Sequence, residues 1–502
     1  MKKIVLMLIL ALILIALAAC GAEAYEDYCY EEEDYAVEDE NYAVEEDYII
    51  EEEGHTVQHF LADLDYMLYV LENNFALFDV AYWARGVDIR AIVEDIRAEI
   101  EQNSDMDVDD FFDSLWHNFS PLTGVGHFQI IGPHYHNNMV NNPGTWHWSF
   151  FPVTSMARVI YPHVLAFYEP RHPNVENEWT MSANDLTDGL IQHRIDHAIF
   201  LGENELAEEL TEAWLDGDYD AVLQLFLYIS EIFSNTPNVR TNIIEEKRIA
   251  HLAIDSFMRG PTIWSREEAQ ILNFLEEIRD FDHLIIDIRR GGGGNPSYFY
   301  NAIMGPNIDR QMLVYGYAFL TPGTYTLEFI GPGFLPPRRL NNVSGLQVRD
   351  GQFRPIAEML EELDLPNLNL ADMERMDYGL SIRTVIGPSR LPRFDRQPAF
   401  DGKIWLLTSP YMGSAGQIIP WVVQDTGFAT LVGEVTGGAY GGPRILVALP
   451  NTGILFQMDL FYVTDQHGRP LEAGTIPDYF NRPGMDALQT VLAMIEEGSY
   501  SP

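Results

Sequence analysis

Cysteine is nearly absent from this sequence: its 502 residues include only Cys20 and Cys29. Both lie close to the N-terminus, so no disulfide framework can hold the rest of the chain together. Cysteine pairs cannot build a metal site either. Stability must therefore come from a buried core, and a chain of this length with 47% hydrophobic residues can form two or three domains with substantial cores.

Basic residues are also few. The 30 lysines and arginines face 76 aspartates and glutamates, which gives a formal net charge of −46. Nothing in this balance would neutralise phosphates, so nucleic acid is excluded as a partner. Part of the charge is local, because the segment from Glu23 to Glu53 holds sixteen acids and no base. Residues 21–54 are predicted to be a disordered, self-repelling tether, with a dedicated binding tail as the alternative.

The chain opens with an apolar run, in the stretch "MKKIVLMLILALILIALAAC". Two lysines, the apolar run and small residues follow one another in the order of a secretory signal. The run is shorter than the roughly 20 residues that a spanning helix prefers, although an uncleaved anchor is the alternative. "LAAC" resembles the bacterial lipoprotein box, which implies a signal peptide over residues 1–20 and lipidation of Cys20. We therefore expect an exported protein, anchored by lipid to the extracytoplasmic face of the cell membrane.

Hydrophobic spacing divides the rest of the chain. Apolar residues recur three and four positions apart from His55 to about Asp113, which predicts helices, and "HFQIIG" reads as a short strand. We expect an N-terminal helical subdomain over residues 55–134. An intermediate region of unclear fold covers residues 135–245, with a helix in "DYDAVLQLFLYISEIF".

A strand, a helix and a second strand follow in "RIAHLAIDSF", "SREEAQILNFLEEIRDF" and "HLIIDIRR", which favours an α/β core with a largely parallel sheet. Ser265 and Glu268 have capping-box spacing, so the helix is expected to begin there. The segment from Ile308 to Asp401, rich in Pro and Gly, is predicted to form loops and edge strands. "RILVALPNTGILFQMDLFYVT" predicts two strands around an Asn-Thr-Gly turn.

The glycine run in "DIRRGGGGNPS" does not continue as a phosphate-binding motif. A Walker loop would need Gly-Lys-Ser/Thr, and a dinucleotide fingerprint would need a glycine at Pro296. The run can still bring backbone N–H groups close to a ligand, as an oxyanion hole requires, or it can be a flexible loop.

The segment "TSPYMGSAGQIIPWVVQDTG" places Ser414 among small residues after an apolar strand. It lacks the Gly-x-Ser-x-Gly pattern, because position 412 is Met. Ser414 is therefore either a nucleophile or the N-cap of the helix that follows.

Four motifs, taken in order, resemble the C-terminal processing (tail-specific) serine peptidases: "HLIIDIRRGGGG", "KIWLLTSPYMGSAGQI", "LVGEVTGG" and "LEAGTIPDYF". The resemblance implies an α/β fold with a strand-strand-helix (ClpP/crotonase-like) catalytic core over residues 246–490. It also implies that Ser414 is the nucleophile. The backbone N–H groups of Ala415 and of Gly293, or its neighbour Gly292, would form the oxyanion hole.

The base requires a separate argument, because many members of the family use a lysine where Ala439 stands. Beyond Lys2 and Lys3 the chain has only Lys247 and Lys403. Lys403 begins the strand that leads to Ser414. Because a strand rises roughly 3.3 Å per residue, the length of this strand keeps Lys403 away from the end at which Ser414 lies. A Ser-Lys dyad is therefore not expected.

The resemblance to the histidine-using, tricorn-like branch instead makes His127, in "FSPLTGVGHFQI", the base, with His117 as its rival. It makes Glu472 the acid that orients the imidazole. The chain departs from that pattern in having Gly126 where the branch has serine, and Gln417 where the family has glutamate.

Other polar residues are assigned structural roles. Asp287 and Asp478 are expected to brace loops. The histidine pairs His134/His136 and His55/His59 could suggest a metal site, but the second pair lacks the glutamate of a zinc helix. No metal or cofactor is expected.

The sequence thus predicts a membrane-anchored lipoprotein with a serine endopeptidase domain that cleaves flexible protein tails or peptides. The alternative is a catalytically inactive lipoprotein of the same fold that binds a peptide or small ligand.

Overall fold

A computed structural model describes residues 54–141, 161–172, 191, 195, 198, 204–235, 237–257, 261–291, 293–330, 347–348, 353–388, 399–438, 442 and 444–499. The chain from Glu53 to Pro502 forms one compact unit. No helix within the described ranges has both the length and the apolar character needed to cross a membrane. The predicted signal peptide, the tether and Cys20 lie outside the described residues.

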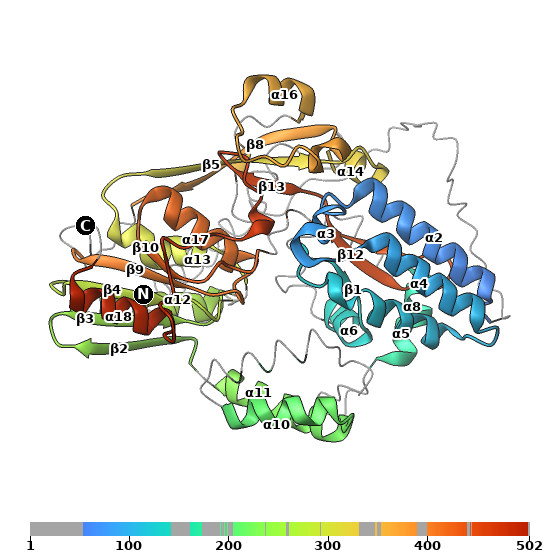
Figure 1. Cartoon of the computed structure of the whole chain (residues 1–502), viewed down its shortest axis with the longest axis horizontal. Coiled ribbons are helices and arrows are strands. Elements are labelled where there is room, and N and C mark those ends of the chain that lie inside the picture. Colours follow the sequence, from blue (N-terminus) through green and yellow to red (C-terminus); the bar gives the residue numbers. More distant parts are fainter. Residues whose placement is uncertain are drawn as a thin grey trace, which may run out of the picture. The chain divides into compact units, whose positions relative to one another are not determined.

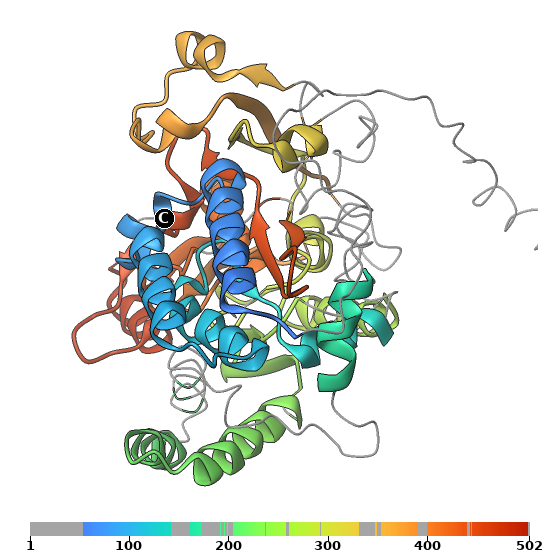
Figure 2. The same ribbon diagram turned by 90° about the vertical axis from the view of Figure 1, so that its right-hand side faces the viewer.

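Four helices open the described chain: α2 (Val57–Asn74), α3 (Val80–Arg85), α4 (Ile89–Gln102) and α5 (Val108–Asn118). The carboxylates of Asp88 and Asp107 cap α4 and α5 by accepting hydrogen bonds from backbone N–H groups of the first turn. Helices α2 and α4 pack side by side, as the blue ribbons of Figure 2 show. The helical pattern predicted from His55 to Asp113 is confirmed.

Further helices follow the short strand β1 (Gln129–Ile130): α6 (Pro133–Asn141), α8 (Pro162–Tyr168), α10 (Asn204–Leu215) and α11 (Tyr219–Asn235). The helix predicted in "DYDAVLQLFLYISEIF" is α11. Its apolar residues and those of α10 form a small core cluster of their own, separate from the main core.

The main sheet has the strand order β14-β10-β9-β4-β3-β2. Its members in chain order are β2 (Val239–Glu245), β3 (Ile249–Ile254), β4 (His283–Asp287), β9 (Lys403–Thr408), β10 (Thr430–Gly433) and β14 (Tyr479–Phe480). Only β2 runs antiparallel to its neighbour. Helix α12 (Pro261–Glu277) connects β3 to β4, and α17 (Ala415–Thr426) connects β9 to β10 (Figure 1). The predicted α/β fold class is confirmed.

Parallel pairing decides where the polar motifs meet. Strands β4 and β9 are in register from His283 opposite Lys403 to Asp287 opposite Leu407. Both strands therefore end at the same edge of the sheet, where ligands bind in open α/β sheets. The glycine run follows β4 and the Ser414 segment follows β9, so the sheet brings the two motifs together.

The segment from Ile308 to Asp401 differs from its prediction. It contains β5 (Met312–Leu320) and β8 (Tyr378–Ile386), which pair antiparallel along their whole lengths. A second sheet forms around them, with the order β13-β5-β8-β6 and β7 beside β8. Burial alternates along most of β8, as expected of a strand with one face on the core. The Pro- and Gly-rich flanks concealed this alternation.

The third sheet carries the predicted hairpin. Its order is β1-β12-β11, with β11 (Arg444–Ala448) and β12 (Leu455–Asp459) joined through the Asn-Thr-Gly turn. The second predicted strand continues past Asp459, but it divides there, because β13 (Tyr462–Asp465) joins the second sheet.

A buried carboxylate holds the hairpin turn to the N-terminal helices. Asp63 of α2 accepts hydrogen bonds from the backbone N–H of Asn451 (2.8 Å) and of Thr452 (2.9 Å), and from the Thr452 hydroxyl (2.7 Å). Burial raises the pKa of Asp63, and these hydrogen bonds oppose that rise. This side chain therefore ties α2 to the turn of the C-terminal hairpin.

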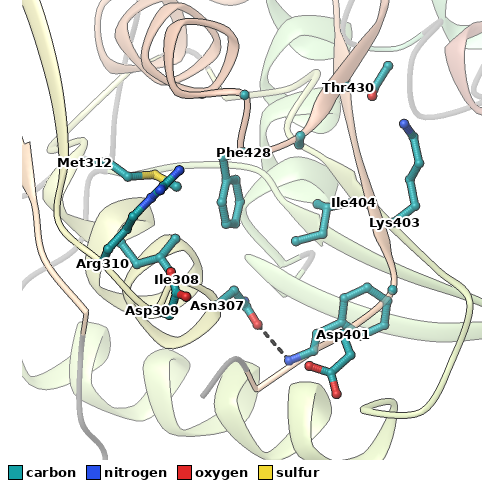
Figure 3. A pocket seen from close by; sticks show the side chains of 14 residues that line it. Asn307, Ile308, Asp309, Arg310, Met312, Asp401, Lys403, Ile404, Phe428 and Thr430 are labelled. Carbon is teal, nitrogen blue, oxygen red and sulfur yellow. Dashed lines mark hydrogen bonds between the residues drawn. The ribbon is translucent and has the colours of Figure 1, made fainter. Parts of the chain in front are cut away.

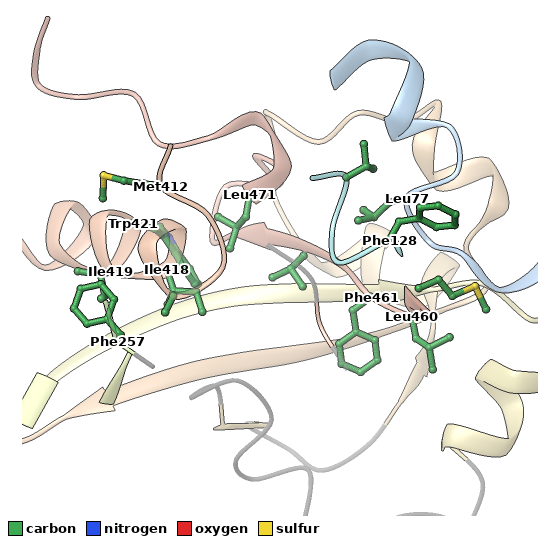
Figure 4. Packing of buried hydrophobic residues seen from close by; sticks show 14 of the residues in the cluster. Leu77, Phe128, Phe257, Met412, Ile418, Ile419, Trp421, Leu460, Phe461 and Leu471 are labelled. Carbon is green, nitrogen blue, oxygen red and sulfur yellow. The ribbon is translucent and has the colours of Figure 1, made fainter. Parts of the chain in front are cut away.

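One continuous apolar core joins the helical part to the α/β part. Figure 4 shows Leu77 and Phe128 on one side, and Met412 and Trp421, before and within α17, on the other. Leu471 lies between them in the same view. This shared core holds the loop before β1 against the start of α17.

Helix α12 begins earlier than predicted. Its first residue is Pro261, so Ser265 and Glu268 lie inside the helix and the expected capping box is wrong. Proline suits the first helical position, because the N–H that it lacks would have no helical partner there. The additional turn carries Trp264, whose ring stacks on Tyr298.

Candidate active site

Ser414 stands at a sharp turn between β9 and α17. Its φ of 51° and ψ of −118° lie in a region that residues with a side chain rarely adopt. Such strain persists only where the surroundings impose it, and it concentrates at functional sites. Ser414 occupies the N-cap position of α17, but its hydroxyl does not cap the helix. Ser414 therefore does not have the helix-capping role that was the alternative to a nucleophile.

Two glycines allow the turn to pack against the glycine run. A Cβ at Gly416 would lie 1.9 Å from the carbonyl oxygen of Gly291, so only glycine permits this approach. Gly293 has φ +149°, and a Cβ there would lie 3.4 Å from the Ser414 Cβ. Gly293 is thus beside the hydroxyl, as predicted, whereas Gly292 lies outside the described residues.

Two backbone N–H donors lie near the hydroxyl. Within the described ranges, no hydrogen bond uses the N–H of Ala415 or of Gly293. Ala415 is the first residue of α17, where helical N–H groups lack intrahelical partners and the helix dipole is positive. These two N–H groups can bind an oxyanion formed on a carbonyl that Ser414 attacks.

His127, in the loop that follows the N-terminal helices and precedes β1, contacts the serine. Its Nε2 lies 3.2 Å from the Ser414 Oγ, although 287 residues separate the two along the chain. The side chain is 20% exposed, so the ring is accessible from solvent on one side. The sequence-based rival, His117, bonds through Nδ1 to the carbonyl of Asp113 in its own helix.

An aspartate that the sequence argument did not select holds the imidazole. His127 Nδ1 lies 3.1 Å from Oδ1 and 3.2 Å from Oδ2 of Asp459, and the His127 backbone N–H also donates to Oδ2. Asp459 is fully buried at the end of β12. Strand β1 pairs with β12 in the register Gln129 opposite Gln457, so residue 127 necessarily comes beside residue 459.

Gly126 makes this contact possible. Its φ is +55°, and a Cβ on it would lie 2.2 Å from Asp459 Oδ2 and 2.7 Å from the Leu77 side chain. A serine at this position, as in the tricorn-like pattern, would occupy the space that the carboxylate fills. The glycine at position 126, which departs from the family pattern, is thus what leaves room for the buried carboxylate of Asp459.

Glu472, the acid expected from the resemblance, lies close to the site but not against the imidazole ring. It is buried in the short helix η8 (Leu471–Ala473), and its Oε2 accepts a hydrogen bond of 3.2 Å from the Gly126 N–H. The structure therefore places Asp459, not Glu472, at His127 Nδ1. Glu472 holds the backbone of the loop that carries the histidine.

A signal for Asp459 does exist in the sequence. It is the single acid in "ILFQMDLFYV", a stretch that is apolar apart from Gln457, and an ionised carboxylate in a buried strand requires hydrogen-bonding partners. This signal indicates that Asp459 has a hydrogen-bonding partner, but it does not indicate which residue that is. The tertiary pairing of β1 with β12 identifies the partner as His127.

Gln417, where the family has glutamate, is completely buried beneath the site. Its amide donates to the Thr475 hydroxyl (3.0 Å), and its carbonyl accepts from the Thr436 hydroxyl. Thr436 in turn accepts from the Thr475 N–H at 2.7 Å. This network fixes the two loops that border α17, which is a positioning role that an uncharged amide can perform.

The two aspartates expected to brace loops have those contacts. Asp287 accepts from the N–H of Arg289, and Asp478 accepts from the N–H of Leu431 at 2.8 Å. Burial alone would raise the pKa of Asp287, but hydrogen bonds from His251 and Arg289 outweigh it and lower that pKa below its ordinary value.

No lysine of the described residues reaches the nucleophile. Lys403 begins β9, whereas Ser414 follows the end of that strand. Lys403 instead lines a cavity of about 680 Å³ at the opposite edge of the sheet, together with Arg310 and Phe428 (Figure 3). Lys247 lies in the turn between β2 and β3. The geometry therefore agrees with the expectation that no Ser-Lys dyad forms.

Comparison with known proteins identifies the chemistry. Residues 248–480 match the family model described as Peptidase family S41, and this match includes Ser414, Asp459 and Glu472 but not His127. No curated protein matches the chain. This match supports the assignment of the chain as a serine-type peptidase, an enzyme that hydrolyses peptide bonds.

Solved structures resemble the chain at low identity. A candidate peptidase from Parabacteroides merdae is 14% identical, over 89% of this chain and 100% of that one, with a TM-score of 0.43. Mature CPAF in complex with lactacystin is 13% identical, over 88% and 97% of the two chains, with a TM-score of 0.45. A lipoprotein from Streptococcus agalactiae is 10% identical, over 64% and 99%, with a TM-score of 0.31.

Proposed function

We propose that the protein is a serine endopeptidase in which Ser414 is the nucleophile, His127 the general base and Asp459 the orienting acid. One observation carries the proposal: the His127 ring contacts the Ser414 hydroxyl through Nε2 and the Asp459 carboxylate through Nδ1. A base that is itself oriented by a third group is the arrangement that activates a serine. The use of histidine supports the further proposal that the chain belongs with the tricorn-like branch.

The hydrogen-bond partners decide the tautomer of the histidine. An ionised aspartate can only accept, so Nδ1 carries the proton and donates it to Asp459. Nε2 then has its lone pair toward the Ser414 O–H and can take that proton. The imidazolium that forms is stabilised by the carboxylate beside it.

The reaction follows from these positions. As His127 takes its proton, Ser414 Oγ attacks the peptide carbonyl, and the N–H groups of Ala415 and Gly293 bind the oxyanion. His127 then protonates the leaving amine, which departs and leaves an acyl ester on Ser414. A water molecule, deprotonated by His127, hydrolyses this ester and restores the enzyme. Removing one oxyanion donor in such a site typically costs about 10² to 10³ in rate.

Flexible protein tails or peptides are the proposed substrates, because the four ordered motifs resemble those of tail-specific peptidases. We further propose that lipidated Cys20 anchors the enzyme on the extracytoplasmic face of the cell membrane. An alkyne-labelled fatty acid supplied to cells should label the wild-type protein and not Cys20→Ala. Equal labelling of both proteins would contradict the anchor.

An active-site probe tests the peptidase directly. A fluorophosphonate should label the wild-type protein at neutral pH, and neither Ser414→Ala nor His127→Ala should be labelled. Lys403→Ala is the matched control, because its side chain lies at the other edge of the sheet, and it should be labelled like the wild type. Absence of labelling in well-folded wild-type protein would support the alternative, a binding lipoprotein of the same fold.

A further inference from the structure

A short helix beside the site carries a cation whose role the peptidase mechanism does not explain. Arg85 ends α3, and Gly86 follows it as a left-handed cap with φ 71°. Helix α3 contacts both η1 (Ser120–Leu122), which precedes the His127 loop, and η8, which carries Glu472. Tyr82, three residues before Arg85 and hence on the same face of the helix, is 67% exposed.

The Arg85 guanidinium lies between the loops of the base and of the nucleophile. Its Nη2 donates to the carbonyl of Gly124 (3.3 Å) and to the carbonyl of Gly437 (2.8 Å). Gly124 precedes His127 by three residues, and the Gly437 N–H donates to the Met412 carbonyl at 2.8 Å, two residues before Ser414. At about 3.5 Å per residue, these connections keep the guanidinium within roughly 15 Å of the hydroxyl.

This arginine has no carboxylate partner among the described residues. Several other arginines do pair with acids, such as Arg90 with Glu72 and Arg482 with Glu497. Arg85 is exposed and bonds only to backbone carbonyls, both through one nitrogen. Its Nε and Nη1 have no acceptor in the described part of the chain. Three of its five N–H donors therefore remain for a ligand.

Two properties make this group suited to a carboxylate. The pair of carbonyl bonds holds the guanidinium in place, so binding loses less side-chain freedom than binding to a free arginine would. Hydrogen bonds between guanidinium and carboxylate are charge-assisted and stronger than neutral ones. Glu472, an acid on η8, which α3 contacts, is buried and holds the Gly126 N–H.

We propose that Arg85 binds a carboxylate of the substrate and so makes the enzyme select peptides with a negative charge near the scissile bond. The inference rests on the proposed peptidase function. An extended peptide advances about 3.3 Å per residue, so the charge falls within about five residues of the bond that is cut. The carboxylate belongs either to an Asp or Glu side chain or to the free C-terminus of the substrate, and the experiment separates these sources.

The first measurement maps cleavage sites in a proteome-derived peptide library by mass spectrometry. The wild type should enrich Asp and Glu at one fixed position within five residues of the cut, or should cut within five residues of free C-termini. Arg85→Gln should lose the enrichment, Arg85→Lys should retain part of it, and Arg85→Glu should favour Lys and Arg instead. Arg354→Gln is the matched control, because Arg354 is paired with Glu362 beside β8, and it should keep the wild-type pattern.

The second measurement uses matched quenched fluorescent peptides with Glu or Gln at the selected position, each with a free or amidated C-terminus. The wild-type kcat/KM should be about tenfold higher for the charged member of the responsible pair. In Arg85→Gln that ratio should approach one. Each ratio is taken within one variant, so a general loss of activity cancels. Equal ratios in the wild type and in Arg85→Gln would overturn the inference.

A binding measurement separates this inference from the peptidase proposal. If the wild type is neither labelled nor able to cleave the library, the proposed function fails. Fluorescein-labelled octapeptide pools, differing only in Glu or Gln content or in C-terminal amidation, are then titrated against Ser414→Ala. About tenfold tighter binding of a charged pool to Ser414→Ala supports carboxylate recognition without catalysis, provided that the difference is lost in the double variant Ser414→Ala/Arg85→Gln. Equal affinities for the charged and neutral pools refute it.

Discussion

The identity of the acid beside His127 is the sharpest prediction from this structure, and two conservative substitutions decide it. Asp459→Asn keeps the size of the side chain but gives it an amide that can donate to Nδ1. The imidazole then carries its proton on Nε2, facing the Ser414 hydroxyl, and cannot accept another. Glu472→Gln alters the acceptor for the Gly126 N–H, and the amide oxygen of glutamine can still accept that hydrogen bond.

The expected magnitudes are far apart. A wrong tautomer in a Ser-His-Asp arrangement lowers kcat by about 10⁴, which is about 5 kcal/mol at 1.36 kcal/mol for each factor of ten. Glu472→Gln replaces a charge-assisted hydrogen bond with a neutral one, a loss of roughly 1 kcal/mol, and so slows the reaction less than about tenfold. Both effects act on the same histidine loop, so the two variants are matched in position and in charge change.

The assay is the second-order rate constant of fluorophosphonate labelling, with kcat/KM on a cleaved peptide as the second readout. Both variants should keep the wild-type circular dichroism and unfolding midpoint to within a few degrees. A loss of more than a thousandfold in Glu472→Gln, with less than tenfold in Asp459→Asn, would refute the reasoning and restore the acid that the motif order suggested.

Three further substitutions test the surroundings of the site. Gly126→Ser forces a side chain into the space of the Asp459 carboxylate at a positive φ, and activity should fall at least about a hundredfold; activity above a tenth of wild type would contradict the packing. Asp63→Ala removes the acceptor for the hairpin turn, and urea unfolding should show a loss of about 3 kcal/mol, whereas a change below 0.5 kcal/mol would deny its role. The pKa of Asp287 is lowered in the folded state, so its stabilisation is present above the ordinary carboxyl pKa of about 4 and is lost as pH falls below it. The difference in unfolding free energy between wild type and Asp287→Asn should accordingly be constant from pH 5 to 7 and shrink toward pH 3; a difference that grows in acid would be inconsistent with this sign.

The main elements of the fold could be predicted because their signals are local. The helices from residue 55 onward and the strands on either side of α12 follow from hydrophobic spacing, which a window of a dozen residues contains. Strands β5 and β8 were missed, because their partners are each other across nearly 60 residues of Pro- and Gly-rich chain. Tertiary pairing outweighs composition in such segments.

The candidate site divides in the same way. Ser414 and the glycine run lie within short motifs, so their proximity follows from parallel strand order. The contact between His127 and Asp459 depends on the register of β1 against β12, which no local pattern encodes. Order along the chain favoured Glu472 because it stands beside the terminal Pro-Asp motif, and it does lie near the site. Only the register of β1 against β12 shows that Asp459 contacts the His127 ring, whereas Glu472 contacts the backbone N–H of Gly126.

The pairing of β1 with β12 also determines when the enzyme can become active. During synthesis the ribosome produces the base first, the nucleophile almost 300 residues later and the aspartate 45 residues after that. A nascent chain that has released Ser414 but not β12 lacks the strand that seats the histidine, so its serine has no base. Base, nucleophile and acid therefore come together only once the third sheet has formed, so the contact between them depends on the tertiary fold and not on any single segment.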